Sequence, residues 1–176
     1  MEFVPLSDTT LRLLALDDPW LKRVFRGVVP ADGLPQNPSR TTRAAYIVNT
    51  DPEGEPGRHW LALWTENQVC EVLDSYGLPL TTYGAPDLLA WLDRWPHLLR
   101  SEQTLQALNS TACGHYALMF LKDRARGESM IQFVQKFSPN DLVGSNRCVG
   151  QDVRRWIVDE LQEGRQTNVT RYEALK

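Results

Sequence analysis

Residues 59–74, with the sequence HWLALWTENQVCEVLD, contain two short apolar runs separated by a polar stretch. Each run is as long as an ordinary strand and rich in aliphatic and aromatic side chains, and the ENQ between them is short enough for a tight turn. The segment therefore predicts a hairpin of antiparallel strands. His59 opens the first strand and Asp74 closes the second, so these two ends of the hairpin are expected to lie close together.

Further strands and helices are expected on either side of this hairpin. An apolar stretch at 43–50 predicts a buried strand, 101–106 is short enough for an edge strand, and the Pro, Gly and Asn residues of 26–42 indicate an irregular connection. Apolar spacing, capping residues and prolines predict helical segments at 7–25 with a break near Pro19, 86–95, 113–122, 127–137 and 146–164. Strands in the middle of the chain with helices on both sides favour an α+β fold.

A single domain over residues 1–176 is expected, because the chain has the length of one ordinary domain and contains no repeat or linker. Residues 1–26 are expected to form an N-terminal helical segment, and 165–176 a flexible tail. No run of roughly 18 apolar residues is present, so no membrane association is expected. The first twenty residues lack the basic and apolar regions of a secretory signal, which predicts a protein that is not secreted.

The cysteine content limits the chemistry that the chain can perform. Cys70, Cys113 and Cys148 are too few and too odd in number for a disulfide framework, and their spacings match no zinc pattern. No metal or other required cofactor is therefore expected, and any cysteine chemistry is expected to be catalytic or redox. The formal net charge of −3 gives no general attraction to nucleic acid.

Cys113 lies where small polar residues give way to an apolar run, in the segment LQALNSTACGHYALMF at 105–120. This pattern predicts a helix that begins at Cys113, with Ser110 and Thr111 as capping candidates. A helix N-terminus stabilises a thiolate, which is the form that attacks carbonyl groups. The placement alone leaves two interpretations open, a nucleophile or a small buried residue at the start of a core helix.

A cysteine protease also needs an imidazole to pair with the thiolate and a third group to orient that imidazole. His59 at one end of the predicted hairpin supplies the imidazole, and Asp74 at the other end supplies a carboxylate that can hold the ring. His115, two residues after Cys113, is interpreted as a packing or cleft-lining residue because it faces another side of the helix. Residue types alone are weak evidence for such a set.

Three blocks of the sequence resemble the active-site segments of adenovirus-type cysteine endopeptidases (adenain): GRHWLALW, VCEVLDSYG and LQALNSTACGHYALMFL. The resemblance is closest to the proteases of Polinton/Maverick elements or related double-stranded DNA viruses, and it extends more distantly to Ulp1/SENP-like proteases. It implies an α+β fold in which a central mixed or antiparallel sheet packs against helices, with the catalytic cysteine at a helix N-terminus.

The resemblance assigns a role to each matching residue. It implies that Cys113 is the nucleophile, His59 the general base and Asp74 the group that orients His59. It also implies that Gln106, seven residues before Cys113, forms the oxyanion hole with the backbone N–H of Cys113. Three further residues of the same blocks are candidates for the substrate cleft: Trp60, Asn109 and Gly114.

By the same resemblance, the chain is expected to be a thiol endopeptidase that cleaves near small residues, glycine above all, and matures viral capsid precursors. Its partners would be these protein substrates, and it would work in the virion and in the nucleus or cytoplasm of the host cell. In the family a disulfide-linked peptide and DNA act as activators. Cys148 follows the nucleophile as such a disulfide requires, although its surroundings do not match, and a weak association with DNA is a further expectation.

Three alternatives remain open at the level of sequence. A SUMO- or ubiquitin-like isopeptidase would use the same four residues, so only its cleft and exosite would differ. An effector-type acetyltransferase uses a histidine, an acid and a cysteine as well, and would transfer an acyl group without proteolysis. A non-catalytic interaction domain is disfavoured because all four residues are intact.

Overall fold

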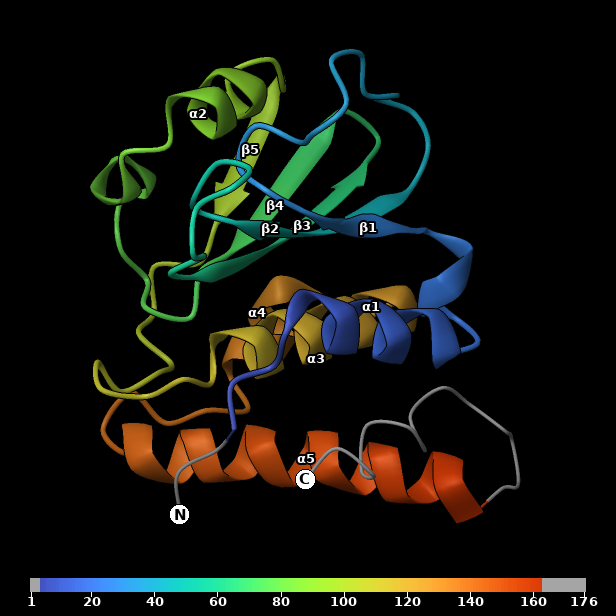
Figure 1. Cartoon of the computed structure of the whole chain (residues 1–176), viewed down its shortest axis with the longest axis vertical. Helices are drawn as coiled ribbons and strands as arrows, with labels where there is room; N and C mark the ends of the chain where they lie inside the picture. The colour runs from blue at the N-terminus through green and yellow to red at the C-terminus, as the bar shows by residue number, and fades with distance from the viewer. Residues whose placement is uncertain (1–3, 163–176) are drawn as a thin grey trace.

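A mixed β-sheet lies between two unequal layers of helices in the computed structural model, which describes residues 4–162 (Figure 1). The predicted tail at 165–176 lies outside the described residues. Within the described part, five strands form one sheet in chain order: β1 (Phe25–Val29), β2 (Ala44–Asn49), β3 (Trp60–Glu66), β4 (Val69–Leu73) and β5 (His97–Arg100). The helices are α1 (Asp8–Asp17), α2 (Pro86–Leu92), α3 (Cys113–Ala125), α4 (Met130–Val134) and α5 (Leu142–Gln162), with the short 3-10 turns η1 (Leu21–Arg23) and η2 (Leu80–Tyr83).

The predicted hairpin is the centre of the sheet. β3 pairs antiparallel with β4, from Glu66 opposite Val69 to Ala62 opposite Leu73. The turn between them consists of Asn67 and Gln68, which both have left-handed backbone angles, with φ of 48° and 66°. Two such residues form the kind of turn whose twist matches that of the flanking strands. The hairpin register is therefore fixed at this turn.

The pairing of the outer strands makes the sheet mixed. A mixed sheet is one of the two forms that the sequence resemblance implies. β2 pairs antiparallel with β3, whereas β1 pairs parallel with β2 and β5 pairs parallel with β4. The fold is thus α+β, with a mixed sheet packed against helices and with Cys113 as the first residue of α3.

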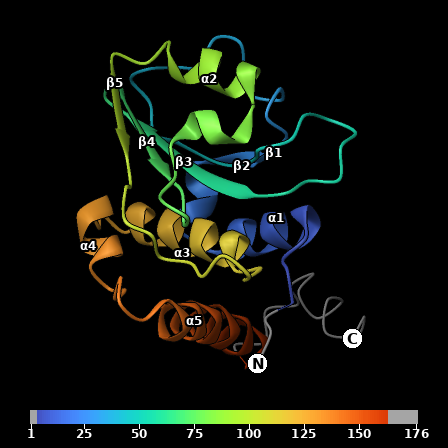
Figure 2. The ribbon, with the colours of Figure 1, turned by 90° about the vertical axis from the view of Figure 1, so that its left-hand side faces the viewer.

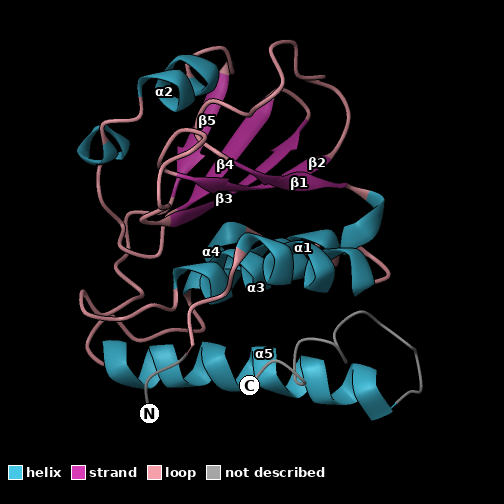
Figure 3. Ribbon diagram, in the orientation of Figure 1, coloured by secondary structure: helices cyan, strands magenta, loops and turns pink. Residues whose placement is uncertain are grey.

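Helices lie on both faces of the sheet (Figures 2 and 3). Each face buries its own apolar cluster. One face packs on α1 and α3, and α5 covers α3 from outside; the cluster there includes Trp64, Tyr116 and Phe120. The other face packs on α2 through Leu88 and Trp91. Helices on both faces hold the sheet rigidly, and a rigid sheet keeps its strand ends in place.

Two predicted segments are corrected by the structure. Residues 25–29 form β1, although 26–42 was expected to be irregular and the first helical segment was expected to reach Phe25. β1 is held by parallel pairing with the distant β2 and contains a register irregularity at Gly27, so no local alternation reveals it. Likewise the edge strand is 97–100 instead of 101–106.

The segment that follows β5 is a loop with specific backbone contacts. Ser101 N donates to Val72 O at 3.1 Å, and the backbone N–H groups of Leu105 and Gln106 both donate to Ser75 O, at 2.8 and 2.9 Å. These bonds tie the loop to the end of β4 and carry Gln106 toward the site. Among the described residues, no helix is both long enough and apolar enough to cross a membrane.

Candidate active site

His59 and Asp74 meet at the open end of the β3–β4 hairpin. His59 directly precedes β3 and Asp74 directly follows β4, so the antiparallel register brings the two side chains together. His59 Nε2 lies 2.8 Å from Asp74 Oδ1, in a hydrogen bond that the imidazole donates. Both residues are buried, at 4% and 1% exposure. A hydrogen bond between them is therefore shielded from water and fixes the orientation of the ring.

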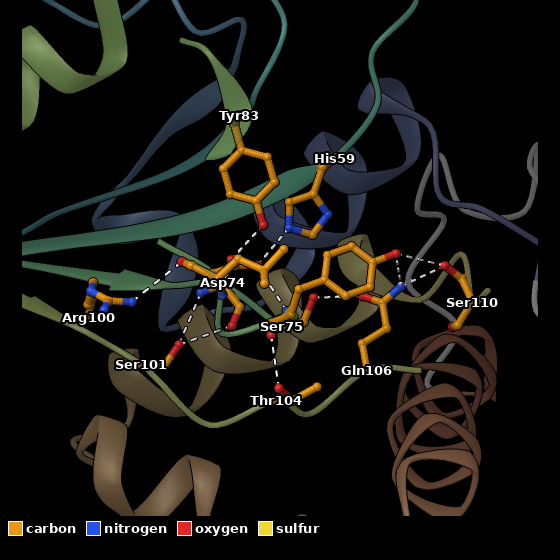
Figure 4. A network of polar contacts seen from close by, with 11 residues as sticks. His59, Asp74, Ser75, Tyr83, Arg100, Ser101, Thr104, Gln106 and Ser110 are labelled. Atoms are coloured by element: carbon orange, nitrogen blue, oxygen red, sulfur yellow. Dashed lines mark hydrogen bonds and ion pairs between the residues drawn. The ribbon is translucent and has the colours of Figure 1, made fainter. Parts of the chain in front are cut away.

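The carboxylate of Asp74 accepts three more hydrogen bonds (Figure 4). The backbone N–H of Tyr76 donates to Oδ1 at 2.9 Å, the backbone N–H of Leu78 donates to Oδ2 at 3.1 Å, and Tyr83 Oη donates to Oδ2 at 2.6 Å. Burial by itself would raise the pKa of Asp74, but the bonds from His59 and Tyr83 outweigh it and hold that pKa below its ordinary value. Asp74 is thus a fixed negative charge.

The imidazole of His59 is held between aromatic neighbours and faces Cys113. The rings of Tyr76 and Tyr83 stack on it, with centroid distances of 4.7 and 5.1 Å. Burial would lower the pKa of His59, but the bond to Asp74 and the sulfur of Cys113 raise it to about 9. His59 is therefore an imidazolium at neutral pH.

The second ring nitrogen of His59 is free for the sulfur. Nδ1 is buried, and it makes no hydrogen bond of good geometry to any residue that the structure describes. Cys113 is the neighbour that acts electrostatically on this ring, and on Tyr76 and Tyr83 as well. Nδ1 therefore remains open to Cys113, and a hydrogen bond that tightens only when substrate binds is common for a catalytic pair.

Cys113 reaches this place as the first residue of α3 and is partly exposed. The N-cap is Ala112, which offers no side-chain cap, so the prediction that Ser110 or Thr111 caps the helix is wrong. Ser110 instead accepts a hydrogen bond from Ala112 N through Oγ, at 3.1 Å. Without a side-chain cap, the first N–H groups of α3 stay available to a negative charge near Cys113.

The side chain of Gln106 is fully buried and hydrogen-bonded at both ends of its amide. Ser75 Oγ donates to Oε1 at 2.7 Å. Nε2 donates to the carbonyl oxygen of Ser110 at 2.7 Å and to Tyr76 Oη at 3.3 Å. Both N–H bonds of the amide therefore have partners, and the longer one, to Tyr76, is the weaker.

The three cleft candidates, Trp60, Asn109 and Gly114, lie in different surroundings. Gly114 is buried, and a Cβ there would lie 3.3 Å from Leu11 Cδ2 and 3.4 Å from Trp60 Cδ1, so a larger residue would press on these neighbours. Trp60 is partly buried against the core and also lines a cavity of about 470 Å³. Asn109 is exposed and lines a second cavity, of about 820 Å³.

The remaining cysteines and His115 lie away from this site. Cys70 is buried in the sheet, and burial raises its pKa. Cys148 is exposed on α5. His115 is buried in α3, and its burial lowers its pKa to about 4, which keeps it neutral. Among the residues described, no cluster of three or more His, Cys, Asp or Glu side chains could hold a metal ion.

Sequence reasoning did not identify Ser75, Tyr76 and Tyr83. The first two directly follow Asp74, and a serine and a tyrosine after a strand end that carries a candidate residue are a usable signal. Tyr83 reaches Asp74 only because η2 folds back over the strand end, which no local pattern reveals.

No family model and no curated protein matches the chain. Among solved structures, the ASFV pS273R protease is similar, in a selenomethionine form with a TM-score of 0.39 and in a second structure with a TM-score of 0.37. Both have 17% sequence identity and cover 65% of this chain, but only 44% and 43% of their own chains. The chain thus spans less than half the length of these neighbours. At such values the similarity carries no conclusion about activity, and the function has to be argued from the residues of the site.

Proposed function

We propose that the chain is a thiol endopeptidase with Cys113 as nucleophile, His59 as general acid and base, and Asp74 as the residue that positions His59. One observation carries the proposal: His59 is bonded to a buried carboxylate through Nε2, leaves Nδ1 without a hydrogen bond among the described residues, and is acted on electrostatically by Cys113 at a helix N-terminus. An imidazolium held in this way stabilises a thiolate beside it, and the pair is the resting state that thiol proteases need.

In the proposed reaction Cys113 Sγ attacks the carbonyl carbon of the scissile bond. The C–N bond then breaks, and the leaving amine takes the proton of His59, which leaves a thioester on Cys113. Water attacks the thioester while His59 accepts a proton from it. The acid is released, and the thiolate and imidazolium are restored.

The oxyanion of each tetrahedral intermediate would be held by the backbone N–H of Cys113 and by Gln106. Because both amide protons of Gln106 already have partners, substrate binding would exchange its longer bond, to Tyr76 Oη, for the oxyanion. The bond from Ser75 to the other end of the amide fixes which way Nε2 points. A donor of this kind contributes about 10²–10³ in rate.

The substrate and setting are proposed from the sequence resemblance. We take the substrates to be viral capsid precursors cut near glycine, the site of action to be the virion and the infected cell, and a peptide or DNA to be the potential activator. The finer assignment to adenovirus-type or Polinton proteases rests on the three sequence blocks alone.

A cysteine-directed experiment tests the proposed function. Wild type, Cys113→Ala and Cys148→Ala are incubated with a peptide library, with SUMO precursors and with acetyl-CoA plus an acceptor peptide. We expect peptide cleavage and covalent labelling by a peptide-based thiol inhibitor in wild type and Cys148→Ala, and neither in Cys113→Ala. Cleavage by Cys113→Ala would contradict the mechanism. Selective SUMO cleavage, or acyl transfer without proteolysis, would contradict the substrate class.

A further inference from the structure

A large cavity lies between the segment that leads to Cys113 and the outer helix α5. Its volume is about 820 Å³. One wall is formed by Ala107 and residues 109–111, which end two residues before the nucleophile, and a second wall by one side of α5. Val4 and Pro5 contribute at one edge. The lining residue Ser110 accepts a hydrogen bond from Gln106 Nε2, so the cavity adjoins the proposed oxyanion donor.

Among the described residues, the lining of this cavity carries two positive charges and no negative charge. Arg147 and Arg154 line it, and no aspartate or glutamate does. Both arginines are exposed, and within the described part of the chain neither makes an ion pair or a side-chain hydrogen bond. Two unpaired guanidinium groups in a concave site are unusual in a chain whose formal net charge is −3, and they favour an anionic ligand.

The spacing of the two arginines fits an extended peptide. Seven residues are nearly two helical turns, so both side chains lie on one side of α5, about 10 Å apart along its axis. In an extended chain, side chains on one face recur about every 7 Å, and every second one about every 13 Å. Arginine side chains are long enough to reach either spacing, so two acids placed two or four residues apart can each meet one guanidinium.

The other groups of the wall suit the backbone of such a peptide. Asn109, Ser110 and Gln151 line the cavity with polar side chains that can donate to or accept from main-chain groups. A nucleic acid would be met by a longer stripe of cations and by aromatic stacking surfaces, and the lining contains neither.

We propose that this cavity, which we call the α5 groove, binds an acidic, extended stretch of the protein substrate, with Arg147 and Arg154 as the residues that select for Asp or Glu. That the bound chain is a substrate rests on the proposed function. That an acidic, extended chain binds in the groove does not depend on it. The groove would hold the substrate on one side of the scissile bond and so place that bond at Cys113.

Binding is measured first on Cys113→Ala, which cannot consume the peptide. The probes are a fluorescent peptide with two aspartates four residues apart and the same peptide with asparagines, followed by fluorescence anisotropy at low and high salt. We expect the acidic peptide to bind more tightly, with the difference shrinking at high salt. Arg147→Glu and Arg154→Glu should each weaken its binding by about threefold to tenfold, and the double variant by more.

The matched control is Arg155→Glu, which makes the same charge change on the same helix. Arg155 lies outside the groove and pairs with Asp152 at 3.7 Å, so this variant should bind like the parent protein. Equal binding of the two peptides would overturn the proposal, as would equal weakening by Arg155→Glu and Arg147→Glu. Tighter binding of a single-stranded oligonucleotide, lost in the same variants, would overturn the choice of a peptide.

Cleavage separates this proposal from the proposed function. In the protein with Cys113 intact, acidic library members should show a higher kcat/KM, and Arg147→Glu should remove that preference while neutral peptides are cut as before. If acidic peptides bind in the groove but are never cut, the proposed protease activity is contradicted and the proposed binding in the groove is not. If peptides are cut with no preference for acidic members, the proposed role of the groove is contradicted and the proposed protease activity is not.

Discussion

Tyr83 Oη donates a 2.6 Å hydrogen bond to Oδ2 of Asp74, the carboxylate oxygen that His59 does not use. The ring of the same tyrosine stacks on the imidazole of His59. One residue on η2 therefore contacts both members of the buried pair. Tyr83 is best described as a positioning residue, because it acts on the imidazole partly through the carboxylate.

Replacing Tyr83 by phenylalanine should keep the stacking and remove the hydrogen bond. Because that bond lowers the pKa of Asp74, Tyr83→Phe should raise that pKa and move the acid limb of the pH–rate profile to higher pH. Loss of one hydrogen bond to a charged group should lower kcat/KM about tenfold. Tyr46→Phe, which removes a tyrosine hydroxyl that bonds neither His59 nor Asp74, is the control. An unchanged acid limb in Tyr83→Phe would argue against the positioning role.

Replacing Asp74 by asparagine should neutralise His59. The carboxylate and the sulfur of Cys113 together raise the pKa of His59 to about 9 against the effect of burial, so in Asp74→Asn burial is opposed by the sulfur alone and that pKa should fall below neutrality. The imidazole would then be uncharged at pH 7, and turnover should fall by up to about 10⁴-fold. Histidine NMR titration measures the pKa, with Asp51→Asn as a control because Asp51 pairs with Arg58. An unshifted His59 resonance would disprove the coupling.

The raised pKa of His59 also predicts how stability depends on pH. A histidine that binds its proton more tightly in the folded state stabilises that state fully below its unfolded pKa, near 6.5, and this contribution is lost as pH rises through about 9. The difference in free energy of unfolding between wild type and His59→Gln should therefore shrink between pH 6.5 and pH 9. Urea unfolding at several pH values measures it. If this difference in free energy of unfolding instead grows between pH 6.5 and pH 9, the proposed stabilisation by a protonated His59 is contradicted.

Ser75 and Gln106 should act as a unit. Gln106→Ala removes the proposed oxyanion donor and should cost about 10²–10³ in kcat. Ser75→Ala leaves the donor in place but frees its orientation, and should cost about tenfold in kcat with little change in KM. In the double variant the loss should equal that of Gln106→Ala alone. Additive losses would show that Ser75 acts on something other than Gln106.

The β3–β4 turn stores backbone strain at Gln68. A residue with a side chain pays about 1 kcal/mol for a left-handed backbone, whereas glycine does not. Gln68→Gly should therefore raise the melting temperature by a few degrees, since its backbone bonds to Arg40 and His97 are kept. Gln68→Ala keeps the strain and should give no increase. Equal effects of the two variants would mean that the side chain, and not the backbone angle, matters.

The hairpin could be predicted from the sequence because its pairing is local. Its two apolar runs and its turn lie within sixteen residues, and the apolar pattern of β2 is equally clear. β1 and β5 could not be predicted in this way. Each is a short strand at an edge of the sheet, held by parallel pairing with one strand that is not adjacent in its local sequence. Non-local pairing overrides the weak local preferences of such segments.

The candidate site follows the same division. His59, Asp74, Cys113 and Gln106 were named from the sequence, and the structure brings them to one place, while their chemical roles remain predictions. The saturated amide of Gln106 could not be foreseen, because it depends on the path of residues 107–111 over the end of β4. The charge of the α5 groove was also hidden, since Arg147 and Arg154 are indistinguishable in sequence from ordinary surface arginines.

The turn at Asn67 and Gln68 has a consequence for how this protein can vary. Side chains alternate between the two faces of a strand, so one residue added to the turn would shift β4 against β3 and send Asp74 to the face opposite His59. Insertions are usually harmless in surface loops, and the exposed residues 52–58, in the loop at the other end of β3, could accept one. A neutral-looking change of length at the far tip of the hairpin would instead separate base from carboxylate without altering either residue.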